Sequence, residues 1–209
     1  MIRAKHSIWL NFFFNIYLSW LFRKHFHKIG TFGKFEDKSL PLLAIANHIS
    51  WWDGFWILRL NKKTLKRKFH VMMMEEQLKK HMFFKKLGAF SIRKKSRTTK
   101  ESLDYAVEIL KSNKNMMLMF PQGEIHSQHL HDFSFEKGLD HILKKTENPI
   151  QVLMFANVLD YFSKPKPILS QYIYSPEKTT GFTCKELQDS YNEFFSDCIK
   201  QQTMMGSEA

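Results

Sequence analysis

The sequence predicts an α/β fold with a mixed, mostly parallel central sheet that is flanked by helices. Short apolar runs that suit buried strands recur along the chain, and segments with helical periodicity separate them. Alternating strands and helices favour parallel pairing through crossover connections. The 209 residues contain no internal repeat and are enough for one core. We expect a single α/β domain over residues 31–209, preceded by a separate helical region over residues 1–30.

The individual elements follow from apolar runs, capping residues and turn residues. A polar turn region is expected over residues 30–39. The expected strands lie at residues 42–46, 69–74, 116–120, 149–156 and 167–174. The expected helices lie at residues 54–60, 76–86, 98–110, 133–145 and 185–201, the last with Thr183 as its N-cap.

Residues 7–22 contain no charged side chain, and basic residues flank them on both sides. Four polar residues recur every four positions and draw a narrow stripe along an otherwise apolar and aromatic helix: Ser7, Asn11, Asn15 and Ser19. At about 1.5 Å per residue this helix is shorter than a hydrocarbon core of ~30 Å. We expect an amphipathic helix that lies in the headgroup region of an anionic membrane. A helix packed on the domain's own core is the alternative.

Composition narrows the class of partner. The net charge is +12, from 32 Lys and Arg against 20 Asp and Glu, and aromatic residues make up 15% of the chain. Positive charge alone would suit nucleic acid or an anionic membrane, but the many aromatic residues favour the membrane, and no nucleic-acid motif is present. Cys184 and Cys198 lack metal-ligand spacing, which indicates reduced thiols and the cytoplasmic face of the cell membrane.

A histidine and an aspartate stand at the exit of the strand expected at residues 42–46. His48 and Asp53 are five positions apart and can meet only if His48 lies in the turn before the helix. With Ser50 as N-cap, Asp53 would be the third helical residue, where a carboxylate is favoured. Asp53 could then orient His48 as a general base. A capping box between Ser50 and Asp53 explains the same spacing without catalysis.

These residues, together with two later segments, resemble the glycerolipid acyltransferase family of 1-acylglycerol-3-phosphate and lysophospholipid acyltransferases. The resemblance covers roughly residues 40–175. Asn47, His48 and Asp53 match the family's first block, N-H-x4-D. In the second block, residues 88–94, Lys94 stands at the position of an arginine that holds the acceptor's phosphate, with Arg93 beside it. Neighbouring strand residues face opposite ways, so only one of the two should enter the site.

The third block departs from the family pattern F-P-E-G-T-R-S. Residues 120–126 read F-P-Q-G-E-I-H, so Gln122 replaces a glutamate, Glu124 a threonine and Ile125 an arginine. Gaining an acid and losing a cation should weaken the binding of a phosphorylated acceptor. We therefore expect an acceptor other than simple acylglycerol phosphate, such as a lysophospholipid with a masked phosphate, a glycosylated lipid or pigment, or a hydroxylated aminolipid. The fourth block keeps only its first proline, Pro149.

The resemblance implies an O-acyltransferase in which His48, oriented by Asp53, activates the acceptor hydroxyl. The acyl donor would be acyl-CoA or acyl carrier protein, and no cofactor or metal would be needed. The expected substrate-binding residues are Asn47, Arg93, Lys94, Phe120, Pro121, Gln122, Gly123 and Glu124. Two alternatives stay open: a basic, membrane-peripheral lipid-binding protein without catalysis, and a metal site at His126, His129, His131 and Asp132.

Overall fold

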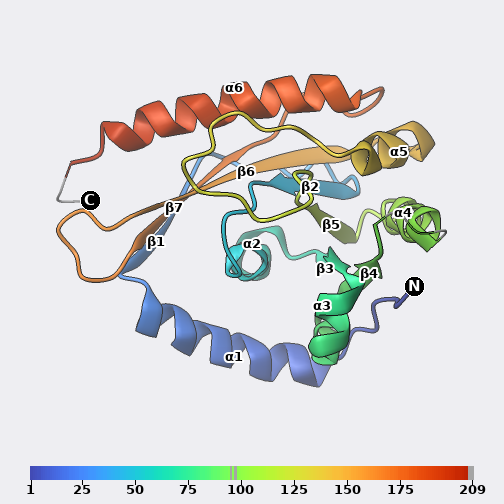
Figure 1. Ribbon diagram of the computed structural model, residues 1–209, viewed down its shortest axis with the longest axis horizontal. Coiled ribbons are helices and arrows are strands. Elements are labelled where there is room, and N and C mark those ends of the chain that lie inside the picture. The colour runs from blue at the N-terminus through green and yellow to red at the C-terminus, as the bar shows by residue number, and fades with distance from the viewer. Residues whose placement is uncertain (95, 97, 207–209) are drawn as a thin grey trace.

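The computed structural model describes residues 1–94, 96 and 98–206 (Figure 1). Seven strands form one sheet in the order β1-β7-β6-β2-β5-β3-β4. The strands are β1 (Lys28–Phe32), β2 (Leu42–Ala46), β3 (Lys68–Met74), β4 (Ala89–Ile92), β5 (Asn115–Met119), β6 (Gln151–Asp160) and β7 (Ile168–Tyr174). The helices are α1 (Ile8–His25), α2 (Asp53–Leu60), α3 (Glu75–Lys80), α4 (Thr98–Ile109), α5 (Lys137–Lys145) and α6 (Cys184–Thr203).

The strand pairing confirms the predicted fold class. All neighbouring strands run parallel except β6 and β7, which are antiparallel. β2 lies between β5 and β6, and all five of its residues are buried. A strand that is covered on both faces needs an uninterrupted apolar run, which is how residues 42–46 read. β2 is the middle strand of the sheet, so its carboxyl end lies at the centre of the side where the parallel strands end.

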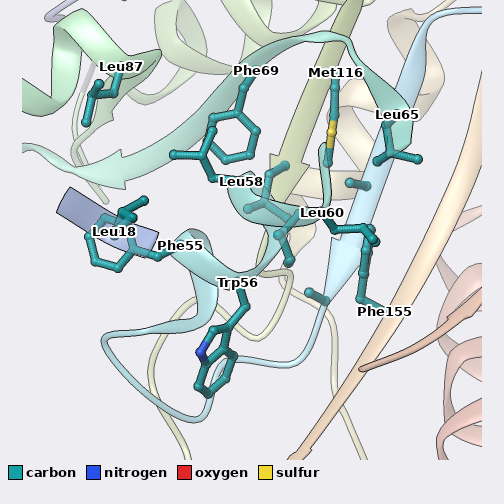
Figure 2. Close-up of a cluster of buried hydrophobic side chains, with 14 of the residues drawn as sticks. Leu18, Phe55, Trp56, Leu58, Leu60, Leu65, Phe69, Leu87, Met116 and Phe155 are labelled. Atoms are coloured by element: carbon teal, nitrogen blue, oxygen red, sulfur yellow. The ribbon is translucent and has the colours of Figure 1, made fainter. Parts of the chain in front are cut away.

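Helices cover both faces of the sheet and divide the core into two clusters. Side chains of β2 alternate between them: Leu42, Ala44 and Ala46 join the cluster under α1, α2 and α3, whereas Leu43 and Ile45 join the cluster under α4, α5 and α6. Figure 1 shows α1 and α6 along opposite sides of the sheet. Figure 2 shows the first cluster, in which residues of α2 meet side chains of the strands.

Several predicted boundaries differ from those of the structure. The region expected to be a polar turn contains part of β1, an edge strand whose side chains are largely exposed, so no apolar run marks it. The helix expected over residues 76–86 is divided into α3 and a 3₁₀ helix, Met82–Leu87. The helix expected from residue 133 begins only at Lys137. The Thr183 cap of α6 is confirmed, with a complete capping box to Glu186.

The N-terminal segment is fastened to the domain on both sides of α1. Before the helix, the amides of Lys5 and Ser7 donate to the carbonyls of Lys85 and Lys86 at 2.8 and 2.9 Å. After it, the amide of His27 donates to the carbonyl of Pro167 at 2.9 Å. No helix in the described ranges is both long and apolar enough to cross a bilayer. The helix predicted from residues 7–22 is thus present, and it is held against the body of the domain.

Candidate active site

The turn between β2 and α2 brings His48 and Asp53 together. His48 Nδ1 lies 2.7 Å from Asp53 Oδ2. Asp53 is completely buried and also accepts hydrogen bonds from the amides of Ile49 and Ser50, at 2.7 and 3.0 Å, and from the hydroxyl of Ser50 at 2.8 Å. These bonds fix both carboxylate oxygens. The carboxylate therefore holds the imidazole in one orientation with Nδ1 as the bonded nitrogen.

The turn differs from the expected one in where the helix begins. α2 begins at Asp53, so Asp53 is the first helical residue rather than the third, and Ser50 is not the N-cap of α2. The Ser50 hydroxyl instead accepts from the amide of Trp52 at 3.1 Å. The Ser50 amide also donates to the Asp53 carboxylate, but no side chain among the described residues caps the first turn of α2, so the expected capping box is not formed. One carboxylate oxygen thus both closes the turn through the Ile49 and Ser50 amides and contacts the imidazole.

The His48 ring lies at an accessible position beside the third block. It stacks on the ring of Phe120 with 4.3 Å between centroids, and 24% of its side chain is exposed. The backbone of His48 is also fixed: its amide donates to Gln122 Oε1 at 2.7 Å, and its carbonyl accepts from the amide of His126 at 2.9 Å. With Nδ1 occupied by Asp53, Nε2 is the ring nitrogen left for a substrate hydroxyl.

The side chain of Asn47 points into the sheet, toward the neighbouring strand β6. It is buried, and its amide group bonds to the backbone of Asn157 on β6 through Nδ2 at 2.9 Å and Oδ1 at 2.8 Å. Gln171 on β7 completes this network by donating to Asn157 Oδ1 at 3.0 Å. The side chain expected to contact substrate is therefore committed to the neighbouring strand. It fixes the end of β2, from which His48 projects.

The third block forms a tight turn against His48. Gly123 has a φ of +77°, which a residue with a Cβ rarely adopts, and its amide donates to the carbonyl of Phe120 at 3.0 Å. Pro121 is buried, and its carbonyl accepts from the amide of Glu136 at 2.8 Å. Gln122 is buried beside His48, and its Nε2 has no hydrogen-bond partner among the described residues. The turn thus supports the backbone on both sides of the imidazole.

The two cations of the second block have different partners, but both lie beyond the end of β4 at Ile92, so the expected strand alternation does not separate them. Arg93 Nη2 lies 2.7 Å from Glu75 Oε1, at the beginning of α3. Hydrogen bonds from Lys79 and from Arg93 hold the pKa of the Glu75 carboxyl below its ordinary value. Lys94 Nζ instead lies 2.9 Å from Glu136 Oε1, next to Gly123. Lys94 is therefore the cation that reaches the third block.

The remaining members of the third block are exposed. Glu124 Oε1 lies 3.6 Å from His126 Nε2. Ile125 is exposed, and it stands at the position where the resembled family has an arginine. Within the described ranges, no group of three or more His, Cys, Asp or Glu side chains is placed to hold a metal ion. The histidine-rich segment at residues 126–132 therefore forms no such group within the described ranges.

Sequence reasoning did not anticipate Glu136, because it stands in a loop 42 residues from Lys94 with no motif around it. It also missed the contact of Gln122 with the His48 amide. The replacement of a glutamate by glutamine drew attention to position 122, but a side chain-to-backbone bond carries no sequence signal.

The chain belongs to the Acyltransferase family, whose model matches residues 26–156. A search of curated protein sequences finds no significant match. The match covers the His48 turn, both cations and the third block, and it confirms the family predicted from the sequence. The protein is therefore an acyltransferase enzyme, and its class requires an acyl donor and a lipid acceptor.

Proposed function

We propose that the enzyme moves a fatty acyl chain from acyl-CoA or acyl carrier protein to a hydroxyl of a membrane lipid, with His48 as general base. His48 Nε2 takes the hydroxyl proton while the acceptor oxygen bonds to the thioester carbonyl carbon. The carbon–sulfur bond then breaks, and the thiolate recovers the proton from the imidazolium. The observation that carries this proposal is the 2.7 Å contact between His48 Nδ1 and the fully buried carboxylate of Asp53. General base catalysis of this kind contributes about 10²–10⁴-fold.

The acceptor in this proposal is a lipid other than simple acylglycerol phosphate. Arg93 and Lys94 both already have carboxylate partners, Glu75 and Glu136. The exposed Ile125 supplies no charge where the family has an arginine. A phosphomonoester is bound best by unpaired cations with charge-assisted hydrogen bonds. These pairings favour an acceptor with a neutral or zwitterionic head group.

We also propose that α1 places the enzyme on the cytoplasmic face of an anionic membrane. Large apolar side chains project from this helix into solvent, each more than half exposed: Ile8, Trp9, Phe12, Phe13, Ile16, Tyr17 and Trp20. An exposed apolar surface of this kind marks an interaction site, and basic residues flank it in sequence. Ring contacts then lead from Phe14 on α1 to Phe55 on α2 and on to the exposed Trp51, which lies in the turn between β2 and α2. This arrangement supports delivery of lipid to His48 from a membrane surface.

The acyl-transfer proposal is tested by incubating the enzyme with radiolabelled acyl-CoA or acyl carrier protein and a panel of acceptors. The panel contains acylglycerol phosphate, lysophospholipids with phosphodiester head groups, and hydroxylated glycolipids and aminolipids. We expect His48→Ala to lose at least about 10²-fold in turnover while keeping its thermal unfolding midpoint. His129→Ala is the matched control, because His129 is exposed in the loop after the third block. Wild-type turnover by His48→Ala would refute the proposed base, and a clear preference for acylglycerol phosphate would refute the proposed acceptor class.

The membrane proposal is tested by flotation of the protein with lipid vesicles. The double variant Trp9→Ser, Trp20→Ser should float less with vesicles that contain anionic lipid. Tyr161→Ser is the control, since the exposure of Tyr161 (58%) lies between those of Trp20 (53%) and Trp9 (77%) but Tyr161 lies beyond β6. Equal flotation of the double variant and the wild type would contradict docking through α1.

A further inference from the structure

A lysine–glutamate pair lies directly over the third-block turn. Lys94 Nζ and Glu136 Oε1 are 2.9 Å apart. A Cβ built on Gly123 would come within 2.7 Å of Lys94 Nζ and 3.0 Å of Glu136 Oε1. Gly123 follows Gln122, whose side chain binds the amide of His48. The ion pair therefore sits one residue along the chain from a direct contact of the proposed base.

Glu136 is held in this place by its backbone. Its amide donates to the carbonyl of Pro121 at 2.8 Å, which ties the start of α5 to the third block. Two side chains of α6 hold the residues just before Glu136. Asn192 accepts from the amide of Phe133 at 2.9 Å, and Gln188 accepts from the amide of Phe135 at 2.8 Å. These bonds explain why residues 133–136 are not helical. They place the Glu136 backbone within reach of Lys94 for a side-chain contact.

Of the second-block cations that the structure describes, Lys94 is the one that an anionic head group at the turn would meet. Arg93 is directed away to Glu75, and Glu124 adds a negative charge beside His126. Both partners of the Lys94–Glu136 pair are partly exposed, at 42% and 56% of their side chains, so solvent screens the pair and a ligand can reach it. A phosphate bound to Lys94 at about 3 Å would also lie within about 6 Å of the Glu136 carboxylate, where like charges repel.

Resting on the proposed function, we propose that Glu136 is a specificity-determining residue that excludes phosphomonoester acceptors. Its carboxylate forms an ion pair with the Lys94 ammonium and repels a second anion. A lipid with an uncharged hydroxyl head group meets no such repulsion at the turn. The enzyme thereby selects acceptors such as monoacylglycerol-like or glycosylated lipids over acylglycerol phosphate.

The direct test is calorimetric titration of the full-length protein with glycerol 3-phosphate, and with glycerol as the uncharged reference. Glu136→Gln keeps the backbone bond to Pro121 and should fold; we expect it to bind glycerol 3-phosphate about tenfold more tightly than the wild type. The gain should vanish in the double variant Glu136→Gln, Lys94→Gln. Asp140→Asn is the matched control, because it removes one negative charge from an exposed lysine pair, Asp140–Lys144, on α5. Equal gains in Glu136→Gln and Asp140→Asn, or no gain in Glu136→Gln, would overturn the proposal.

The second measurement is the ratio of acyl transfer to 1-acylglycerol phosphate over 1-acylglycerol, which differ only in the phosphate. Glu136→Gln should raise this ratio about tenfold, and Asp140→Asn should leave it unchanged. An unchanged ratio in Glu136→Gln would count against the proposal. If the wild type transferred no acyl chain from any donor, the proposed function would be refuted instead. The titration would still decide whether Glu136 excludes phosphate.

Discussion

The sharpest test of the His48–Asp53 pair is the substitution Asp53→Asn. An asparagine can keep its amide oxygen at the position of Oδ2, where it would still accept from His48 Nδ1 and from the amides of Ile49 and Ser50. Its amide nitrogen would donate to the Ser50 hydroxyl, reversing the present bond. The turn can therefore persist, and what is lost is the negative charge beside the imidazole.

The magnitude follows from the charge that develops during the reaction. When His48 takes the acceptor's proton it becomes an imidazolium, and Asp53 stabilises that charge from a contact of 2.7 Å between the nearest atoms. For charge centres about 4 Å apart at an effective dielectric constant of about 20, the interaction is about 4 kcal/mol. Losing it should lower kcat by about 10³-fold. Replacing the four hydrogen bonds of the Asp53 carboxylate by neutral ones should lower the free energy of unfolding by only about 1–3 kcal/mol.

The assay is steady-state transfer from an acyl thioester to the best acceptor of the panel, with thermal unfolding measured on the same samples. Asp53→Ala is the informative companion, because it leaves the Ile49 and Ser50 amides and the Ser50 hydroxyl without their partner, and it should destabilise the protein more than Asp53→Asn does. If folded Asp53→Asn keeps more than a tenth of wild-type kcat, the carboxylate closes the turn without assisting the base. The catalytic half of the interpretation would then be wrong.

Two further substitutions test the supports of the site, and a third tests a buried histidine of β3. Gly123→Ala should lower turnover, because a Cβ at φ +77° is strained and would come within 2.7 Å of Lys94 Nζ; wild-type kinetics would contradict this. Gln122→Ala leaves the His48 amide without its acceptor and should lower both kcat and the free energy of unfolding, the latter by about 1–3 kcal/mol in denaturant titration; full stability would mean that water replaces the bond. Burial lowers the pKa of His70 to about 4, so the unfolded chain binds more protons below about pH 6.5, and stability should fall by about 2 kcal/mol between pH 7.5 and 5. His70→Gln should flatten this dependence, and an equal fall in the variant would assign it to other groups.

The parts of the fold that could be predicted are those in which local sequence and burial agree. Residues 42–46 are apolar at every position because β2 is covered on both faces, so the run itself identifies a central parallel strand. The cap at Thr183 could be predicted because both partners of the capping box lie within three residues. The meeting of His48 and Asp53 was open to prediction for the same reason, since one turn of five residues brings them together.

The parts that could not be predicted depend on contacts between distant segments. β1 is an edge strand held by backbone bonds to β7, and its side chains do not show the apolar alternation that would reveal it. Residues 133–136 read as helical, but their amides bind Pro121 and two side chains of α6. The Lys94–Glu136 pair results from that tertiary arrangement. Spacing along the chain contains no information about it.

The attachment of α1 at both ends limits how the domain can move on a surface. Hydrogen bonds from Lys5 and Ser7 secure the beginning of the helix, and the bond from His27 secures the chain just beyond its end. Trp52, within the turn that carries His48, packs against Phe22 and Phe26 near the end of α1. The end of the helix and the turn are thus packed against each other. Any bilayer that receives α1 fixes the tilt of the whole domain, and with it the height of the imidazole above the lipid plane.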